Sequence, residues 1–355
     1  MTKYSDDYIK DFWKTRLPKS QNSLFLYIDN PFCISSCKYC IYSPQKHPIG
    51  GEIYNTYYDA LISKLKEYEP ILSLKKPTGV YFGGGTASAM STKTMRQVFD
   101  AIPRFKEMEY KGLECNPAIT PDSKIDILIE YGFTYVSFGI QSMNKDVVES
   151  QDRYFYDIPR LQRQIKRLRE NGIVVNCDLL AFMETGELSD LVLLAEDLQK
   201  VRDILKPDVN TVYPMYQRFP IEGKLRGKAI YASPEQESLV VDKAFKFRKT
   251  VAKFLRKNSD LSLLTQEDLK TFLDLDDVRN RPTINCAITD HNRDSVANIL
   301  KYNSSGYPNL PEWQDVIAFG GLSSRKIYGY AGVGFNYKSR LNLDSGAFEY
   351  SSLDD

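Results

Sequence analysis

Three cysteines stand close together in the N-terminal part of this chain. Cys33, Cys37 and Cys40 have the spacing C-x3-C-x2-C, and they are half of the chain's six cysteines. Thiolates so close together on one loop favour a metal centre, because soft sulfur ligands select iron–sulfur clusters or zinc. A four-iron cluster normally takes four cysteine ligands. Three cysteines would leave one iron open to bind another molecule, which predicts a cluster that takes part in chemistry.

A structural zinc site is the alternative interpretation of the same loop. His47 follows Cys40 by seven residues, so a Cys3His set of ligands is present in the sequence. Structural zinc sites use such sets. The cysteine loop by itself favours the iron–sulfur cluster and leaves zinc as the second choice.

The elements that must position this loop follow a regular alternation. The apolar run 23–29 predicts a buried strand, and the cysteine loop follows its carboxyl end. The predicted strands are 23–29, 79–82, 110–115, 134–140, 173–180 and 208–214, and the predicted helices are 54–72, 91–103, 121–131, 158–170 and 187–205. Such alternation implies an α/β fold with a parallel sheet and right-handed crossovers. Six units fit a partial (β/α)6 TIM-type barrel that is open on one side.

Two motifs follow the second and third of these strands, where ligands of parallel α/β folds bind. Gly83-Gly84-Gly85-Thr86 would let the backbone approach a ligand closely, although a glycine triplet alone is more often a tight turn. Glu114 could pair with the amino group of a bound amino acid. A solvated strand end capped by Asn116 is the alternative.

Three further polar residues are associated with the fourth and fifth strands. Gln141 offers both a donor and an acceptor for a ribose or a carboxylate, and Arg153 follows in the next loop. Asp178 lies in an apolar strand, where an unpaired carboxylate would be costly. A sugar hydroxyl would satisfy this carboxylate, and a buried partner such as Arg169 is the alternative.

In chain order these segments resemble the radical S-adenosylmethionine (radical SAM) superfamily and, within it, the oxygen-independent coproporphyrinogen III oxidase family and its relatives. The resemblance covers residues 24–215 and rests on the segments LYIDNPFCISSCKYC, FGGGT, ECNP, SFGIQS and CDLL. It implies a [4Fe-4S] cluster on Cys33, Cys37 and Cys40, whose open iron binds S-adenosylmethionine (SAM). It also implies reductive cleavage of SAM to a 5′-deoxyadenosyl radical, with an external one-electron reductant such as flavodoxin or ferredoxin.

The resemblance also implies which residues contact SAM. Tyr39 would lie beside the adenine. The SAM that binds iron would be held by Tyr27, Gly84, Gly85, Thr86 and Glu114. The family positions matched by Gln141, Arg153 and Asp178 contact the nucleoside of SAM or a second SAM. One or two SAM molecules are therefore expected, and a second could donate a methyl or methylene group.

Several positions depart from the family pattern. Asp29-Asn30 stand where the family usually presents a histidine after the Tyr-Ile pair, and no further cysteine follows Cys40 in Ile41-Tyr42-Ser43-Pro44. The fifth strand continues into residues 181–186 without the family's Gly-Leu-Pro turn. The radical-generating half therefore matches the family, and the substrate side is altered.

Composition limits the partners and the location. The chain has 355 residues, with 47 basic and 46 acidic side chains and a net charge of +1. Because the net charge is so small, the protein as a whole has no electrostatic attraction to nucleic acid or acidic lipid. No run approaches the roughly 20 apolar residues of a membrane helix, and the N-terminus lacks the apolar core of a signal peptide. Reduced cysteines fit the cytoplasm. A cytoplasmic protein with no membrane partner is expected, and nucleic acid is disfavoured.

Three regions are expected along the chain. Residues 1–22 form a helical extension, with a helix over 5–16 capped by Ser5. Residues 23–215 form the partial barrel, and 216–355 form a C-terminal α+β appendage that covers the substrate. A basic helix is predicted over 236–256, and the tyrosines of 328–337 could line a substrate cavity or fill a small core.

The favoured hypothesis is a radical SAM enzyme, an oxidoreductase or methyltransferase, that acts on a small molecule or a natural-product precursor. A haem-binding or cluster-carrying protein without turnover is the second hypothesis, although His291-Asn292 lacks the Tyr-Trp that completes the element of the haem-chaperone relatives. A radical SAM enzyme that modifies tRNA or a peptide is the third, and it would need a basic groove.

Overall fold

The structure is a computed structural model, and it describes residues 3–40, 50–183, 188–216, 284–287, 314–321, 327–331, 335–343, 345 and 347–352. The predicted helix 236–256, His47 and His291 lie outside these residues. The chain divides into two compact units, of which the first comprises Met1–Ser36, Tyr42–Tyr135 and Leu310–Asp355 and the second Cys37–Ile41 and Val136–Asn309. The division into regions 1–22, 23–215 and 216–355 stays a prediction.

Four parallel strands form the centre of the first unit: β2 (Ser23–Asn30), β3 (Pro77–Gly84), β4 (Tyr110–Cys115) and β9 (Gln314–Phe319). β2 lies between β3 and β9 and pairs in parallel with both, and β4 pairs in parallel with β3. The interior of β2 is almost continuously buried, as expected for a strand covered on both faces. β9 was not among the six predicted strands, because it comes from the region expected to form the appendage.

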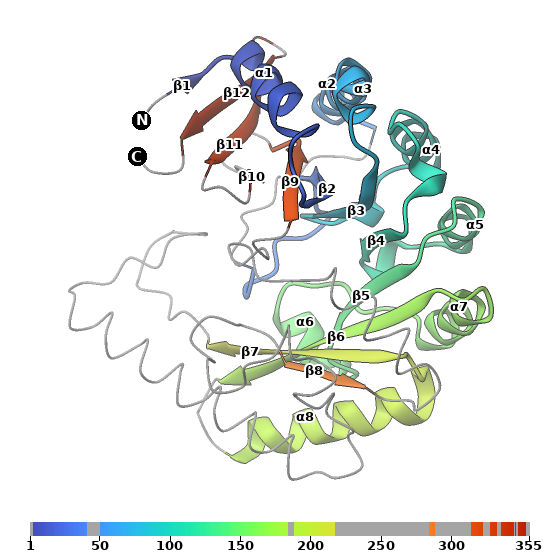
Figure 1. The fold of residues 1–355 in the computed structure, drawn as a ribbon. Helices are drawn as coiled ribbons and strands as arrows, with labels where there is room; N and C mark the ends of the chain where they lie inside the picture. The colour runs from blue at the N-terminus through green and yellow to red at the C-terminus, as the bar shows by residue number, and fades with distance from the viewer. Residues whose placement is uncertain are drawn as a thin grey trace, which may run out of the picture. The chain divides into compact units, whose positions relative to one another are not determined.

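The helices of this unit lie side by side along the parallel strands (Figure 1). They are α2 (Glu52–Glu67), α3 (Glu69–Leu72), α4 (Thr92–Asp100) and α5 (Asp122–Glu130), with short 3-10 turns η1 (Ala87–Ala89), η2 (Phe105–Glu107) and η3 (Pro117–Ile119). The single helix predicted over 54–72 is instead two helices. Pro70 stands in the first turn of α3, where its missing N–H is tolerated, so the chain starts a new helix there.

Antiparallel strands near both termini continue the sheet of the first unit. They are β10 (Ile327–Ala331), β11 (Phe335–Asn342), β12 (Ala347–Ser352) and β1 (Lys3–Tyr4). β10 pairs with β9, and β11, β12 and β1 follow in that order. The two ends of the chain therefore meet in one sheet (Figure 1).

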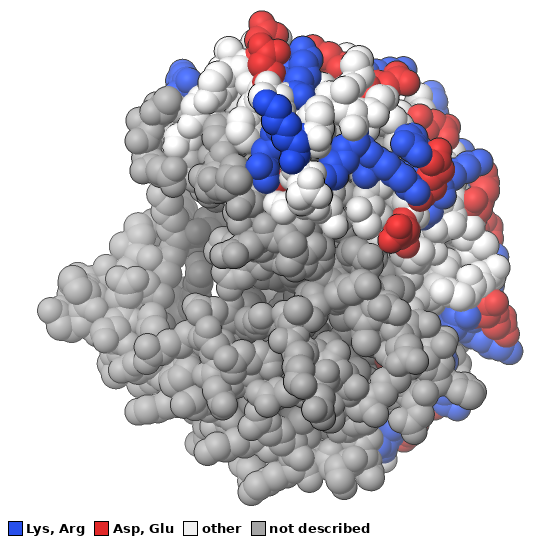
Figure 2. Space-filling view, viewed as in Figure 1, with Lys and Arg blue, Asp and Glu red and all other residues white. Residues whose placement is uncertain are grey.

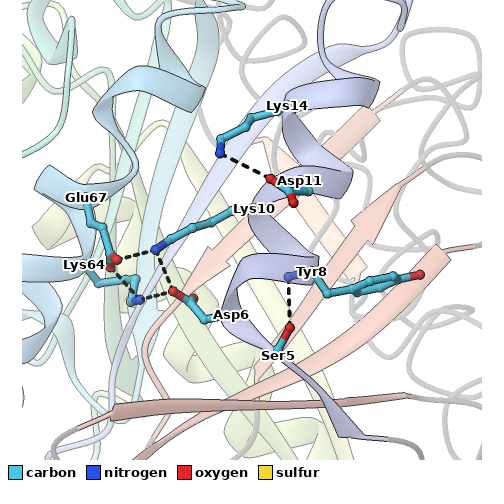
Figure 3. A network of polar contacts seen from close by, with 8 residues as sticks. All are labelled: Ser5, Asp6, Tyr8, Lys10, Asp11, Lys14, Lys64 and Glu67. Atoms are coloured by element: carbon cyan, nitrogen blue, oxygen red, sulfur yellow. Dashed lines mark hydrogen bonds and ion pairs between the residues drawn. The ribbon is translucent and has the colours of Figure 1, made fainter.

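The N-terminal helix α1 (Asp6–Arg16) is tied to α2 by charge. As predicted, Ser5 caps it by accepting a hydrogen bond from the backbone N–H of Tyr8 at 3.1 Å. Lys10 and Lys64 both bridge the carboxylates of Asp6 and Glu67, which joins the two helices (Figure 3). In this helix Ile9 and Trp13 are buried, whereas Tyr8 is half exposed.

A buried carboxylate attaches β9 to the chain that leads into β2. Asp315 is fully buried and accepts hydrogen bonds from Arg16 Nη2 at 2.9 Å, Ser20 Oγ at 2.6 Å and Asn22 Nδ2 at 3.1 Å. A buried charge is tolerated where it is paired and hydrogen-bonded. This cluster therefore holds the C-terminal strand in place beside β2.

The second unit contains β5 (Tyr135–Gln141), whose first residue belongs to the first unit, with β6 (Val174–Met183), β7 (Val209–Tyr216) and β8 (Ile284–Ala287). β6 pairs in parallel with β7, and β8 adds to β7 in antiparallel fashion. The helices are α6 (Lys145–Ser150), α7 (Ile158–Glu170) and α8 (Leu188–Lys200), followed by a π-helical turn η4 (Val201–Leu205). The short helix α6 was not predicted.

The described surface has charges of both signs. Figure 2 shows Lys and Arg side chains interspersed with Asp and Glu on the face that it presents. Two exposed ion pairs illustrate the mixture, Arg96 with Glu130 and Arg104 with Glu107. Among the described residues, no helix is long and apolar enough to cross a membrane.

Candidate functional site

The cysteine loop follows the carboxyl end of β2, as predicted. Cys33, Cys37 and Cys40 are partly exposed and form no disulfide, and the Cys40 N–H donates to the Cys37 carbonyl at 3.0 Å in a turn. Three reduced thiols on one loop are the donor set that a soft metal centre requires. No three His, Cys, Asp or Glu side chains of the described residues are gathered as ligands of one metal ion. Ligation of a cluster by these cysteines therefore stays a prediction.

The glycine turn at the end of β3 lies against the first cysteine. Thr86 Oγ1 is 3.1 Å from Cys33 Sγ. A Cβ on Gly85 would lie 2.8 Å from the Phe32 carbonyl oxygen and 3.1 Å from Cys33 Sγ, and Gly84 has a φ of 116°. Neither position accepts a side chain, because the cysteine loop approaches too closely. The glycines thus bring the turn and the loop together.

Glu114 belongs to a polar pair beside an aromatic stack. The Tyr81 hydroxyl donates to Glu114 Oε1 at 3.0 Å, and the Tyr81 ring stacks on Tyr27 with centroids 6.4 Å apart. The cap proposed in the alternative interpretation is also present, since Asn116 Oδ1 accepts from the Ala118 N–H at 3.1 Å. Glu114 therefore has a defined partner and is a partly exposed residue.

A buried lysine supports both strand ends. Lys124 Nζ donates to the carbonyls of Ser88 at 2.5 Å and Ile119 at 3.2 Å, and the Asn116 N–H donates to Ser88 Oγ at 2.9 Å. Burial lowers the pKa of Lys124. These contacts join the glycine turn to the end of β4. Sequence reasoning missed Lys124, because a lysine in a predicted amphipathic helix is normally assigned to the solvated face.

In the second unit, Arg153 contacts the later half of the cysteine loop. Its Nη1 lies 3.7 Å from Cys37 Sγ, and its Nη2 donates to the Gly139 carbonyl at 2.6 Å. The Lys38 N–H donates to the Gln151 carbonyl at 3.1 Å. A guanidinium at this place can offset the negative charge of a ligating thiolate.

Tyr39 lies in the same loop and keeps its proton. Burial raises the pKa of its hydroxyl well above the usual range, and the nearby Arg153 charge opposes this rise. The half-buried ring is therefore a neutral surface on which a flat ligand could stack. Its place beside an adenine stays a prediction.

Gln141 ends β5 in a strained conformation. Its φ is 68°, which is the left-handed region that non-glycine residues seldom adopt, and its side chain is buried. Backbone strain of this kind is concentrated at functional sites. The strain supports the selection of Gln141 as a binding residue, a role that sequence reasoning proposed from its donor and acceptor atoms and from the family resemblance.

Asp178 has two neutral hydrogen-bond donors rather than a cation. Ser137 Oγ donates to Oδ2 at 2.8 Å and Asn176 Nδ2 to Oδ1 at 2.7 Å. Arg169, the alternative partner, instead pairs with Asp208 at 2.8 Å. Burial raises the pKa of Asp178 to about 6, although the two hydrogen bonds and the Arg153 charge act in the opposite direction. Such a shifted carboxyl marks a candidate binding site.

Comparison with known proteins finds a family model and relatives that are similar to part of this chain. Residues 27–198 match the model of the radical SAM superfamily. The heme chaperone HemW of Lactococcus lactis is 25% identical over 192 residues, which are 53% of this chain and 48% of the relative. The oxygen-independent coproporphyrinogen III oxidase of Synechocystis is 26% identical over 234 residues, 62% of this chain and 47% of the relative. The chain spans about half the length of these relatives.

A solved structure is similar to this chain in fold. The coproporphyrinogen III oxidase (HemN) of Escherichia coli superposes with a TM-score of 0.63 and 19% identity, over 99% of this chain and 76% of that one. The fold is thus the open, TIM-barrel-like fold of radical SAM proteins, and the predicted fold class is confirmed. Among the described residues, seven strands form the parallel part of the sheet, one more than predicted, because β9 joins it.

Proposed function

We propose, on the premise that residues 27–198 form a radical SAM domain, that this chain is an enzyme that holds a [4Fe-4S] cluster on Cys33, Cys37 and Cys40. When bound, the cluster and SAM would supply the electron transfer that yields methionine and a 5′-deoxyadenosyl radical. The observation that carries this proposal is the contact of Cys33 with the glycine turn through Thr86. It supports the proposal, because Cys33, as a ligand of iron, would then lie directly beside the backbone expected to hold SAM.

The protein's own groups have complementary roles in this proposal. The Glu114 carboxylate would accept a hydrogen bond from the amino group of the methionine moiety of SAM. The hydroxyl of Tyr81 would hold the Glu114 carboxylate in that orientation. Arg153 would offset charge beside Cys37. Because the radical chemistry belongs to the cofactors, the protein contributes binding, orientation and protection from side reactions.

The substrate class proposed is a small molecule or a natural-product precursor, with an external one-electron reductant as partner. The relatives similar to this chain bear different names, such as heme chaperone, coproporphyrinogen III oxidase and, in Escherichia coli O157:H7, anaerobilin synthase. Each likeness covers about half of the relative. We therefore expect the shared half to be the part that would generate the radical, and the substrate to be decided elsewhere in the chain.

The test is anaerobic turnover of the reconstituted protein with SAM and dithionite. Release of 5′-deoxyadenosine and methionine by the wild type, and its loss in Cys37→Ala, is the expected result. A reconstituted protein with a full cluster that releases neither compound would contradict the proposed activity.

A second candidate function is haem binding without turnover, and the similarity to proteins named heme chaperone favours it. Titration with haem separates the two proposals. Stoichiometric haem binding by a protein that does not cleave SAM supports the chaperone function. SAM cleavage without haem binding supports the enzyme.

We also propose that Gln141, Arg153 and Asp178 bind a second SAM as a methyl or methylene donor. A single SAM would already account for the cysteines, the glycine turn and Glu114. The resemblance matches the three residues of the second unit to family positions that contact the nucleoside of SAM or a second SAM. Turnover with SAM that has a deuterated methyl group tests this role. Label in the product together with S-adenosylhomocysteine supports it, whereas deoxyadenosine as the sole product derived from SAM contradicts it.

A further inference from the structure

Asn30 is a buried amide between the cysteine loop and the glycine turn. It is the last residue of β2, and its side chain is 2% exposed. Nδ2 donates to the Phe32 carbonyl at 3.2 Å and also to the Thr86 carbonyl. Both amide hydrogens are therefore used, one on the cysteine loop and one on the glycine turn.

The backbone carbonyl and the side-chain oxygen of Asn30 are hydrogen-bonded as well. The backbone carbonyl accepts the Gly85 N–H at 2.5 Å, and Oδ1 accepts the hydroxyl of Tyr58, which lies on α2. Tyr58 is buried, and its ring packs against Phe32 with centroids 5.9 Å apart. An amide with all these partners in a buried place has one orientation, since any rotation would leave polar groups unsatisfied.

We propose that Asn30, oriented by Tyr58, is a positioning residue that holds the first cluster cysteine and the glycine turn at the separation needed for SAM to contact both. This inference rests on the proposed function, because it assigns the turn to SAM. The geometry supports it through Thr86, whose carbonyl accepts from Asn30 and whose hydroxyl lies 3.1 Å from Cys33 Sγ. Thr86 is thus hydrogen-bonded to Asn30 through its carbonyl, and its hydroxyl contacts Cys33, the proposed iron ligand.

Removal of the Asn30 amide is therefore expected to lower SAM affinity without changing the cluster content. Loss of the amide leaves the three thiols in the loop, so iron can still be bound. The glycine turn, however, is no longer held against Cys33, and the methionine moiety of SAM must contact both. SAM binding is therefore weakened while iron content stays near that of the wild type.

The test uses Asn30→Leu, which keeps the size of the side chain and removes its polar atoms, and Tyr58→Phe, which removes only the hydroxyl. The matched control is Tyr54→Phe. Tyr54 lies on the same helix and packs on the same Phe32 ring, but its hydroxyl bonds with Thr94 and the Ser91 N–H. For each protein, iron per chain is measured after reconstitution, and SAM affinity is measured from the change in the electron paramagnetic resonance spectrum of the reduced cluster.

Asn30→Leu is expected to weaken SAM by at least about tenfold, the effect of losing one or two hydrogen bonds, and Tyr58→Phe by roughly threefold to tenfold. Tyr54→Phe should bind SAM as the wild type does. Unchanged affinity in both test variants would overturn the proposal, as would simultaneous loss of iron and SAM in Tyr58→Phe. Equal losses in Tyr54→Phe and Tyr58→Phe would indicate general loosening of the core and would also overturn it.

Hydrogen exchange in the protein without cluster or SAM tests the same contact separately. Exchange at the Gly85 amide should be faster in Asn30→Leu and Tyr58→Phe than in Tyr54→Phe. If Asn30→Leu does not fold, the pair of tyrosine variants decides. A wild type that binds SAM at the cluster and never releases deoxyadenosine would refute the proposed function and leave the role of Asn30 intact.

Discussion

Asp178→Asn is predicted to stabilise the protein at neutral pH. The carboxylate of Asp178 is partly buried beside two neutral donors, and its pKa is raised from 3.8 to about 6. The folded state therefore binds this proton more tightly than the unfolded state does. The resulting stabilisation is fully present below pH 3.8 and is lost as the pH rises through about 6.

The magnitude follows from the two pKa values. Each tenfold change in proton affinity corresponds to about 1.4 kcal/mol, so the ionised Asp178 lowers the free energy of unfolding by up to about 3 kcal/mol at pH 8. This is an upper limit, because solvent reaches part of the side chain. Asparagine keeps an acceptor for Asn176 Nδ2 and offers an amide hydrogen to Ser137 Oγ, and it bears no charge.

Urea unfolding of the protein without cluster or SAM, measured from pH 4 to pH 8, provides the assay. The free energy of unfolding of Asp178→Asn minus that of the wild type should be small at pH 4, rise between about pH 4 and pH 6 and level off above about pH 7. Asp203→Asn, at an exposed carboxylate paired with Arg202, is the control for loss of one negative charge. A difference that is flat with pH, or a variant that is less stable at pH 8, would refute this reasoning.

Three other outcomes are expected. Cys37→Ala should abolish the absorbance at roughly 400 nm that is typical of iron–sulfur clusters. Cys115→Ala should keep this absorbance, because Cys115 is a buried thiol whose pKa is raised by burial to about 12. Iron retained in Cys37→Ala would count against the assigned ligands. Glu114→Ala should weaken the binding of SAM by about ten- to a hundredfold with iron content unchanged, because a charge-assisted hydrogen bond is lost. Calorimetric titration that finds unchanged SAM affinity would mean that Glu114 is a structural residue. Arg16→Ala should lower the free energy of unfolding by about 3 kcal/mol, since it removes the cation from the buried carboxylate of Asp315. A loss below about 1 kcal/mol in urea unfolding would mean that the other donors are sufficient to stabilise this carboxylate.

The sequence by itself determined the local features of this protein. The β4 strand over 110–115 and the α7 helix over 158–170 have the bounds predicted from periodicity. The cap at Ser5 and the cysteine loop after β2 are also encoded within a few residues, because caps and loop spacing depend on near neighbours. The order of motifs along the chain predicted the resemblance to the radical SAM superfamily, and the model of that superfamily matches residues 27–198.

Only the tertiary structure decided which distant residues meet. β9 lies beside β2 although almost three hundred residues separate them, and no local pattern predicts such a pairing. Asp178 has Ser137 and Asn176 as partners, and Arg169 belongs to Asp208, because sheet register and strand order determine which side chains face one another.

The same limit applies to Asn30. Its place at the end of a strand gave no reason to assign it a role, and its departure from the family pattern was the sole indication in the sequence. Its contacts are made with Thr86, which is 56 residues away, and with Tyr58 on a helix that covers the strand. Spacing along the chain determines which residues can bind a cluster, whereas packing between strand, turn and helix determines how firmly that site is held.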